Sequence, residues 1–166
     1  MSTKVEINTG TYLTFRIGSE DFAVDVLKVR EILELVRITQ VPKTPEFMKG
    51  VINLRGSVVP VVDMHIKFGL PAEERTVNTC IIVMEVNIRD EVVVLGAIAD
   101  MVKEVTYIDA ENIEPPPRIG TTVDVEFIQG IGKIGEDFVI ILDINKVFSE
   151  EDIKLVKSVG RQREEE

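Results

Sequence analysis

Few side chains in this sequence could perform acid–base or metal chemistry. His65 is the only histidine, Asp63 precedes it by two residues, and Asp143 follows another apolar run. These three residues are the candidates for a small acid–base or metal enzyme, because imidazole and carboxylate groups transfer protons and bind cations. We expect instead that Asp63 and Asp143 each cap a short helix. His65 is then a surface or half-buried polar residue, since residues two apart share a face only on a strand.

Nucleophilic and phosphate chemistry are also weakly represented. Cys80 is the single cysteine, so it cannot form an internal disulfide, and its run Cys80–Val83 favours an inert core or half-buried position. The segment Gly130–Gly135 has spacing similar to a phosphate-binding loop, but its alternating isoleucines predict a strand that leads into a turn. The sequence therefore favours a protein that binds partners, without a cofactor or a metal, over an enzyme.

The elements that position these residues are mainly strands. The chain of 166 residues holds 25 Val and 20 Ile, which pack well on pleated sheets. Apolar runs separated by short turns predict four hairpins. They cover residues 12–26, 51–62, 80–99 and 131–142.

Helices are expected to be short and few. Thr44–Gly50 and Asp63–Phe68 each combine a capping residue with a terminating glycine, which is typical of one or two helical turns. The clearest helix is the C-terminal one over about residues 149–159, which Ser149 caps and Gly160 ends. Residues 161–166 hold no apolar side chain and are expected to form a disordered tail.

An internal repeat relates the two halves of the chain. Aligning Gly50 with Gly130 also places Phe47 on Phe127, Asp63 on Asp143 and Phe68 on Phe148, without a gap. A second alignment, with a slightly smaller offset, places Val29–Ile32 on Val102–Val105. The duplication predicts two similar small barrels within one domain over residues 11–159, one over about 11–70 and one over about 77–148.

Charge and hydropathy exclude several classes of protein. The formal charge is −10, and a phosphate backbone is bound through Lys and Arg, so nucleic-acid and anionic-membrane binding are disfavoured. The longest uninterrupted apolar stretch is Val92–Ala99, far short of the roughly 20 residues of a spanning helix. With no apolar signal core at the N-terminus, we expect a cytoplasmic protein without direct membrane insertion.

Several segments resemble the CheW family of chemotaxis coupling proteins. The resemblance is carried by these segments of the first half: Asp25–Ile32, Thr44–Gly56 and Val59–Asp63. It continues in these segments of the second half: Gly96–Asp100, Ile113–Pro117, Gly130–Gly132 and Leu142-Asp143. The match spans about residues 12–159, and Asn53-Leu54-Arg55-Gly56 is its most specific block.

The resemblance implies a mainly β fold of two five-stranded, SH3-like barrels that share a hydrophobic core. It also implies a non-enzymatic adaptor that couples the cytoplasmic tips of methyl-accepting chemoreceptors to the regulatory domain of the histidine kinase CheA. Such a protein would act in the cytoplasm, at receptor arrays beneath the inner membrane. An alternative is a CheW-like scaffold that serves a receptor–kinase pathway not devoted to motility.

The resemblance further implies two sets of binding residues. The receptor-binding set is Val29, Glu31, Arg55, Cys80 and Val105. The kinase-facing set is Ile38, Val41 and Gly50. Other interpretations stay open at this point: Val29 and Val105 could be core residues, and Arg55 could be a solvated turn residue.

Overall fold

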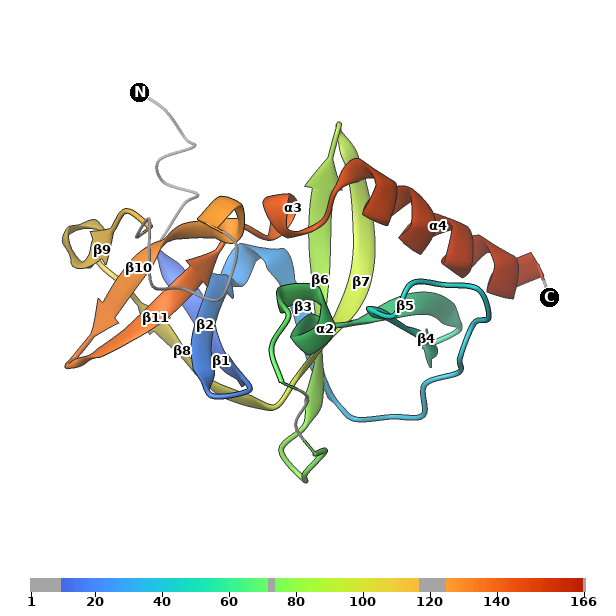
Figure 1. Ribbon diagram of the computed structural model, residues 1–166, viewed down its shortest axis with the longest axis horizontal. Helices are drawn as coiled ribbons and strands as arrows, with labels where there is room; N and C mark the ends of the chain where they lie inside the picture. Colours follow the sequence, from blue (N-terminus) through green and yellow to red (C-terminus); the bar gives the residue numbers. More distant parts are fainter. Residues whose placement is uncertain (1–9, 72–73, 117–124, 166) are drawn as a thin grey trace.

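The computed structural model describes residues 10–71, 74–116 and 125–165, and these form two curled sheets that lie side by side (Figure 1). The first sheet has the strand order β8-β1-β2-β11-β10-β9 and the second has the order β3-β6-β7-β5-β4. The strands of the first sheet are β1 Thr11–Ile17, β2 Glu20–Asp25, β8 Met101–Tyr107, β9 Ile113–Glu114, β10 Ile128–Ile134 and β11 Asp137–Leu142. Those of the second are β3 Val29–Glu34, β4 Met48–Leu54, β5 Ser57–Asp63, β6 Cys80–Ile88 and β7 Glu91–Ala99.

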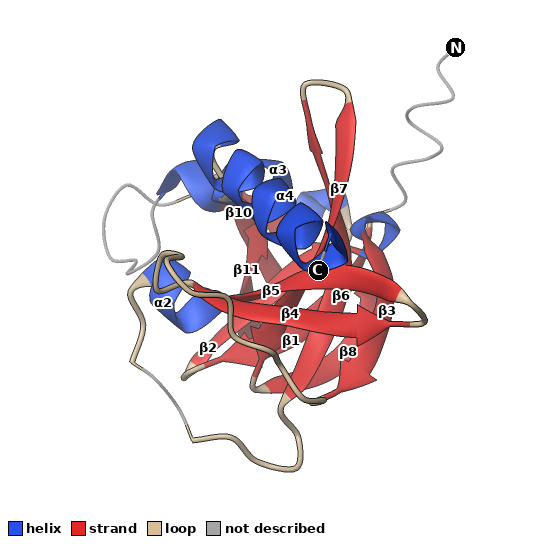
Figure 2. Cartoon of the chain, turned by 90° about the vertical axis from the view of Figure 1, so that its right-hand side faces the viewer, coloured by secondary structure: helices blue, strands red, loops and turns tan. Residues whose placement is uncertain are grey.

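The helices are short except the last one. The 3-10 turns are η1 Val26–Lys28, η2 Ala110–Asn112 and η3 Val125–Phe127, and the α-helices are α2 Met64–Phe68, α3 Ile144–Val147 and α4 Glu150–Glu165. Figure 2 shows α3 and α4 above the sheets, α2 at their left, and the β6–β7 hairpin projecting beyond the other strands. The mainly β fold and the four predicted hairpins are confirmed.

The two sheets are built on one plan. Each contains two antiparallel hairpins joined by a parallel pair, β5 with β7 in one sheet and β11 with β2 in the other. Strands β3, β6, β7, β5 and β4 correspond in order to β8, β1, β2, β11 and β10. This shared five-strand order fits the expected pair of five-stranded barrels, with the short β9 as an addition at one edge.

The predicted division of the chain between the two barrels is wrong. Residues 11–70 and 77–148 were expected to form one barrel each, but β1 and β2 pair with C-terminal strands, while β6 and β7 pair with β3 and β5. The chain therefore enters one sheet, builds the second, and returns to complete the first. The parallel pairings that cause this interleaving join residues far apart in the chain, so no local sequence pattern reveals them.

The backbone confirms the duplication that aligns Gly50 with Gly130. Register shifts occur between Met48 and Gly50 on β4 and between Ile128 and Gly130 on β10. The amide of Asp63 donates to the carbonyl of Phe47 at 2.7 Å, and that of Asp143 donates to Phe127 at 2.9 Å. Equivalent bulges and equivalent loop hydrogen bonds show that the two hairpins are copies of one unit.

Both capping aspartates behave as predicted. Asp63 Oδ1 accepts the amide of His65 at 2.9 Å, and Asp143 Oδ1 accepts the amide of Asn145 at 3.2 Å. Gly69 ends α2 in the left-handed conformation with φ 69°. Each of the two duplicated hairpins, β4–β5 and β10–β11, is thus followed by a short helix that an aspartate caps.

Two helix predictions are wrong. Thr44–Gly50 is a loop that enters β4 at Met48, because Lys43 adopts φ 61° and Thr44 precedes a proline, a position that disfavours helix. Helix α4 continues through Gly160 to Glu165, so the residues expected to form a tail are mostly helical. The residues after Gly160 are good helix formers, and a glycine costs a helix only about 1 kcal/mol.

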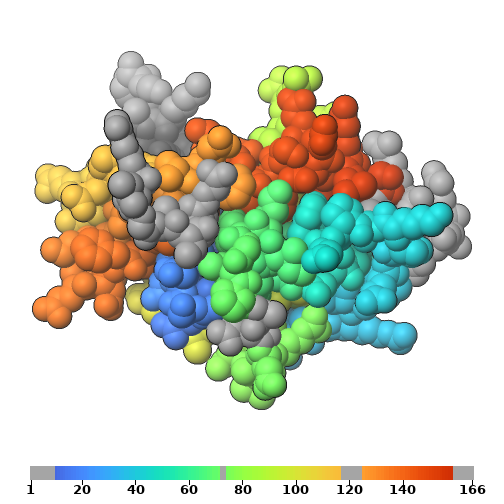
Figure 3. Space-filling model, viewed as in Figure 1, coloured from blue at the N-terminus to red at the C-terminus, as the bar shows by residue number. Residues whose placement is uncertain are grey.

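The two sheets share one apolar core. Phe68 of α2 stacks on Phe22 of β2, with ring centroids 5.4 Å apart, and contacts Phe127 at 6.0 Å. The ammonium of Lys67 lies over the rings of Phe47 and Phe148 and donates to Asp152 at 2.6 Å. In Figure 3 the green surface of α2 lies between the blue surface of β1–β2 and the cyan surface of the loop before β4.

Gly50 closes the second sheet, and this predicts a large effect of adding one methyl group. Its φ is 144°, and a Cβ placed there would lie 2.0 Å from the carbonyl oxygen of Thr39. The backbone amide and carbonyl of Thr39 both form hydrogen bonds with the backbone of Val51. We expect Gly50→Ala to lower the free energy of unfolding by at least about 3 kcal/mol, because the clash with backbone adds to dihedral strain. Urea denaturation measures this.

The matched control is Gly18→Ala. Gly18 also has a positive φ, 65°, but a Cβ there would meet no atom within 4 Å, so only dihedral strain of about 1–2 kcal/mol is expected. If the two variants lose equal stability, the close approach of Thr39 to Gly50 is not what closes the sheet.

Candidate docking surfaces

The turn between β4 and β5 presents Arg55 at the surface. Arg55 and Gly56 have φ values of 50° and 88°, the left-handed pair that matches the twist of a two-residue hairpin. Asn53 Oδ1 accepts the amide of Gly56 at 2.8 Å and so stabilises the turn. The Arg55 side chain is 71% exposed. The turn geometry therefore carries the guanidinium out from the body of the protein.

Glu31 lies on β3, the other edge strand of the same curled sheet, and its carboxylate binds this guanidinium. Arg55 Nη1 donates to Glu31 Oε1 at 3.2 Å, and Nη2 donates to the second carboxylate oxygen. The hydrogen bonds from Arg55 lower the pKa of Glu31, and the same pair raises the pKa of Arg55. A bidentate pair fixes the plane of the guanidinium and leaves its remaining donors directed at solvent.

The other receptor-binding candidates lie near the gap between β3 and β8. A groove of 260 Å³, here called the β3–β8 groove, is lined by Ile32–Glu34, Val77–Cys80, Met101 and Val102. Val29 begins β3 and is partly buried against the shared core. Val105 is 56% exposed on β8, three residues beyond Val102. The structure thus places Val29 and Val105 on the two strands that border this groove.

Cys80 lies inside the β3–β8 groove as an inert thiol. It is buried at the start of β6, where its Sγ lies 3.9 Å from the carbonyl oxygen of Ala99. Burial raises its pKa, which disfavours the nucleophilic thiolate. The predicted core position of Cys80 is therefore confirmed.

Sequence reasoning missed two exposed apolar residues of the β3–β8 groove, Ile32 and Val77. Ile32 is 44% exposed and is the counterpart of Val105 in the alignment that places Val29 on Val102. The bulges also correspond, because Arg30 on β3 and Lys103 on β8 are the residues that the two registers skip. The repeat itself was the signal that could have found Ile32.

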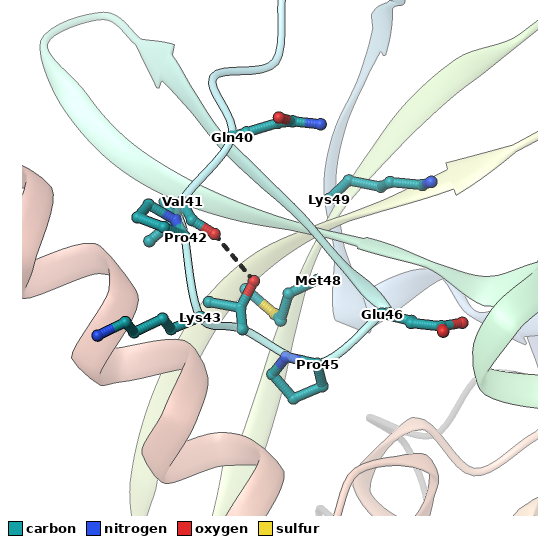
Figure 4. A pocket seen from close by; sticks show the side chains of 9 residues that line it. Gln40, Val41, Pro42, Lys43, Pro45, Glu46, Met48 and Lys49 are labelled. Atoms are coloured by element: carbon teal, nitrogen blue, oxygen red, sulfur yellow. Dashed lines mark hydrogen bonds between the residues drawn. The ribbon is translucent and has the colours of Figure 1, made fainter.

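The kinase-facing candidates gather around the loop before β4. A hollow of 480 Å³, here called the loop hollow, is lined by Gln40–Glu46, Met48 and Lys49 (Figure 4). Val41 is buried there, and its carbonyl accepts the hydroxyl of Thr44 at 3.0 Å. Ile38 is half-buried and packs on the core of the second sheet, while Gly50 is buried beneath Thr39. Ile38 is the most accessible of the three.

The structure does not assemble the enzyme site considered from the sequence. His65 is buried, at 5% exposed, rather than at the surface or half-buried, and its ring lies between Asp63 at 3.2 Å and Asp100 at 2.8 Å. Asp143 belongs to the other hairpin copy, where it caps α3. Among residues 10–71, 74–116 and 125–165, no group of three His, Cys, Asp or Glu side chains could hold a metal ion.

Two curled sheets with exposed apolar residues and an exposed ion pair at their edges are typical of a protein that binds other proteins. The family model described as the CheW-like domain matches residues 11–152. The chain is 37% identical to the chemotaxis protein CheW of Klebsiella aerogenes over 150 residues, which cover 90% of this chain and 88% of that one. It is 34% identical to the chemotaxis protein CheW of Rhizobium meliloti over 140 residues, 84% of this chain and 88% of that one.

A solved structure agrees with these relatives. The crystal structure titled scaffolding protein TtCheW, from Thermoanaerobacter tengcongensis, superposes with a TM-score of 0.76 at 35% identity and covers 85% of this chain and 88% of that one. The chain therefore belongs to the CheW family, whose members are scaffold proteins of chemotaxis rather than enzymes. No helix in the described part of the chain is long and apolar enough to cross a membrane.

The ion pair predicts how Glu31 titrates. Because hydrogen bonds from Arg55 lower the pKa of Glu31, replacing Arg55 with Ala should return that pKa toward its ordinary value. Carbon-detected NMR of the glutamate carboxyl groups, followed through acidic pH, measures the change. Arg30→Ala is the control, since Arg30 on the same strand pairs with Glu85 at 2.6 Å. If Glu31 titrates identically in the parent and in Arg55→Ala, the pair does not persist in solution.

Proposed function

We propose that this chain couples the cytoplasmic tips of methyl-accepting chemoreceptors to the regulatory domain of the histidine kinase CheA. Membership of the CheW family supports an adaptor role in chemotaxis. The observation that carries the proposal is Arg55, which an unusual backbone and Glu31 together hold at the surface. An exposed guanidinium with a fixed plane suits recognition of carboxylate or carbonyl oxygens on a partner.

The receptor tip is proposed to lie along the β3–β8 groove with one end at Arg55. Ile32 and Val105 supply exposed apolar area from two strands, and Glu31 lies on the same strand as Ile32. The receptor-binding residues of the proposal are Val29, Glu31, Arg55, Cys80 and Val105. Cys80 contributes as part of the floor of the groove, because its side chain is almost entirely buried.

The kinase is proposed to use the region of the loop hollow, with Ile38 as the contact and Val41 and Gly50 as the support beneath it. Ile38 packs on the core of the second sheet, and its methyl group lies 3.0 Å from where a Cβ on Gly50 would stand. Separate surfaces would let both partners bind one molecule at once. We propose that the protein then acts in the cytoplasm, at receptor arrays beneath the inner membrane, through these partners.

Arg55→Ala tests the receptor surface. Charged contacts that are desolvated at an interface lose about 2–5 kcal/mol when truncated, and about 1.4 kcal/mol is one decade of affinity. We therefore expect affinity for a receptor-tip fragment to fall at least about tenfold. Affinity for the CheA regulatory domain and the melting temperature should stay nearly unchanged, because an exposed side chain adds little to folding. Calorimetric titration with each partner and a thermal melt measure the three quantities.

Two further variants separate the surfaces. Arg30→Ala removes the same charge from an exposed position on β3, where Arg30 pairs with Glu85, and should bind the receptor normally. Ile38→Asp should lose the kinase domain and keep the receptor. An Arg55→Ala variant that binds the receptor as tightly as the parent would make Arg55 a turn residue and nothing more. Equal losses in Arg30→Ala and Arg55→Ala would mean that general charge drives binding.

A further inference from the structure

His65 is held from both sides of its ring. Its Nδ1 lies 3.2 Å from Asp63 Oδ1, and its Nε2 lies 2.8 Å from Asp100 Oδ2. Both ring nitrogens therefore lie within hydrogen-bonding distance of a carboxylate oxygen. Lys49 Nζ is 3.7 Å from the other oxygen of Asp63, so the ammonium of Lys49 also faces this carboxylate. The contacts fix the ring of His65 in one orientation.

Asp100 is the residue at which the chain returns from the second sheet to the first. Strand β7 of the second sheet ends at Ala99, and β8 of the first begins at Met101. Asp100 Oδ2 also accepts the amide of Gly18 at 2.6 Å, and the amide of Asp100 donates to the carbonyl of Arg16 at 2.9 Å. His65 therefore ties α2, which follows β5, to the β1–β2 turn and to the start of β8.

The duplicated half makes an equivalent tie between the sheets. Asn145 is the counterpart of His65 in the alignment of Gly50 with Gly130 and follows the capping Asp143 by two positions. Its Oδ1 accepts the amide of Asn87 on β6 at 2.9 Å, so it joins α3, which follows β11, to the second sheet. The position two residues after each capping aspartate thus bridges the sheets in both halves.

The two ties lie at different distances from the β3–β8 groove. Asp100 is bonded to Met101, and Met101 and Val102 form one wall of the β3–β8 groove. Asn87 is near the far end of β6, which begins at Cys80 in that groove. At about 3.3 Å per residue, the length of β6 between Cys80 and Asn87 separates the Asn145 tie from the groove by roughly 20 Å.

We propose that His65 is a positioning residue for receptor binding, and this rests on the proposed function. Through Asp100 it sets where β8 begins relative to the second sheet, and so sets the width of the β3–β8 groove. His65 touches no partner itself. Its tie keeps Met101, Val102 and the Val105 that follows them at a fixed distance from β3, which bears Ile32.

Two substitutions of His65 separate its two contacts. His65→Asn keeps a polar group near Nδ1 and loses the contact with Asp100, whereas His65→Gln reaches the position of Nε2 and keeps that contact. We expect His65→Asn to weaken binding of a receptor-tip fragment about three- to tenfold, as mutations along a coupled network do. His65→Gln should bind within about twofold of the parent. Binding of the CheA regulatory domain should be unchanged in both.

Asn145→Ala is the matched control, because it removes the other tie between the sheets. It should lower the melting temperature as His65→Asn does and leave receptor affinity intact. The labelling rate of Cys80 by a thiol reagent gives a readout that needs no partner, since Cys80 lies in the groove and is 8% exposed. The rate should rise severalfold in His65→Asn and stay at the parent value in His65→Gln and Asn145→Ala.

Each outcome decides the inference. Normal receptor affinity and normal Cys80 labelling in His65→Asn would overturn it. Equal effects of His65→Asn and Asn145→Ala on affinity and labelling would also overturn it, by showing a general loosening of the sheets. Failure of the parent protein to bind the receptor tip would instead refute the proposed function, and Cys80 labelling would still test the positioning role of His65.

Discussion

The contact of Phe68 with Phe22 and Phe127 joins the two sheets into one apolar core, and the placement of both candidate docking surfaces depends on that core. The largest buried cluster draws its residues from both sheets, while each sheet retains a smaller cluster of its own. A small barrel alone buries little apolar surface. Sharing a core makes the two barrels one body, so surfaces on different edges keep a constant relation.

The polar ties between the sheets add geometry to this apolar contact. Apolar burial is not directional, whereas hydrogen bonds between named atoms select one relative orientation. His65 and Asn145 each reach from one sheet to the other, and Lys67 joins α2 to α4. Burial opposes ionisation of Asp152, but hydrogen bonds from Lys67 and Ser149 outweigh it and lower its pKa. That contribution to stability is present above the ordinary pKa of an aspartate and is lost as pH falls through the lowered value.

Local structure was largely predictable from the sequence, and the pairing of distant segments was not. The hairpins followed from apolar runs and turns, and the capping role of Asp63 and Asp143 followed from their position after strands. The interleaving of the barrels depends on two parallel pairings with no local signal. His65 was expected at the surface or half-buried, and its burial was not predicted because its second partner, Asp100, is distant in the sequence and reaches it only in the folded chain.

The candidate site was likewise predictable only in part. The resemblance to the CheW family named Arg55, Val29 and Val105 as candidates, and the repeat places Val29 and Val105 on equivalent stretches of β3 and β8. The pairing of Arg55 with Glu31 and the groove between β3 and β8 arise from the curling of the sheets. For the same reason Gly50, a surface candidate from the sequence, is buried beneath Thr39 and supports its neighbours.

We propose that one rigid body carries two docking surfaces that can be occupied together. The most direct test of this proposal is the affinity of this protein for a receptor-tip fragment, in the absence and in the presence of saturating CheA regulatory domain, with analytical ultracentrifugation to identify the species formed. The account predicts a ternary complex with one copy of each component and a receptor affinity that the kinase domain leaves intact or strengthens. Displacement of the receptor fragment by the kinase domain would contradict it, because the two partners would then share one surface.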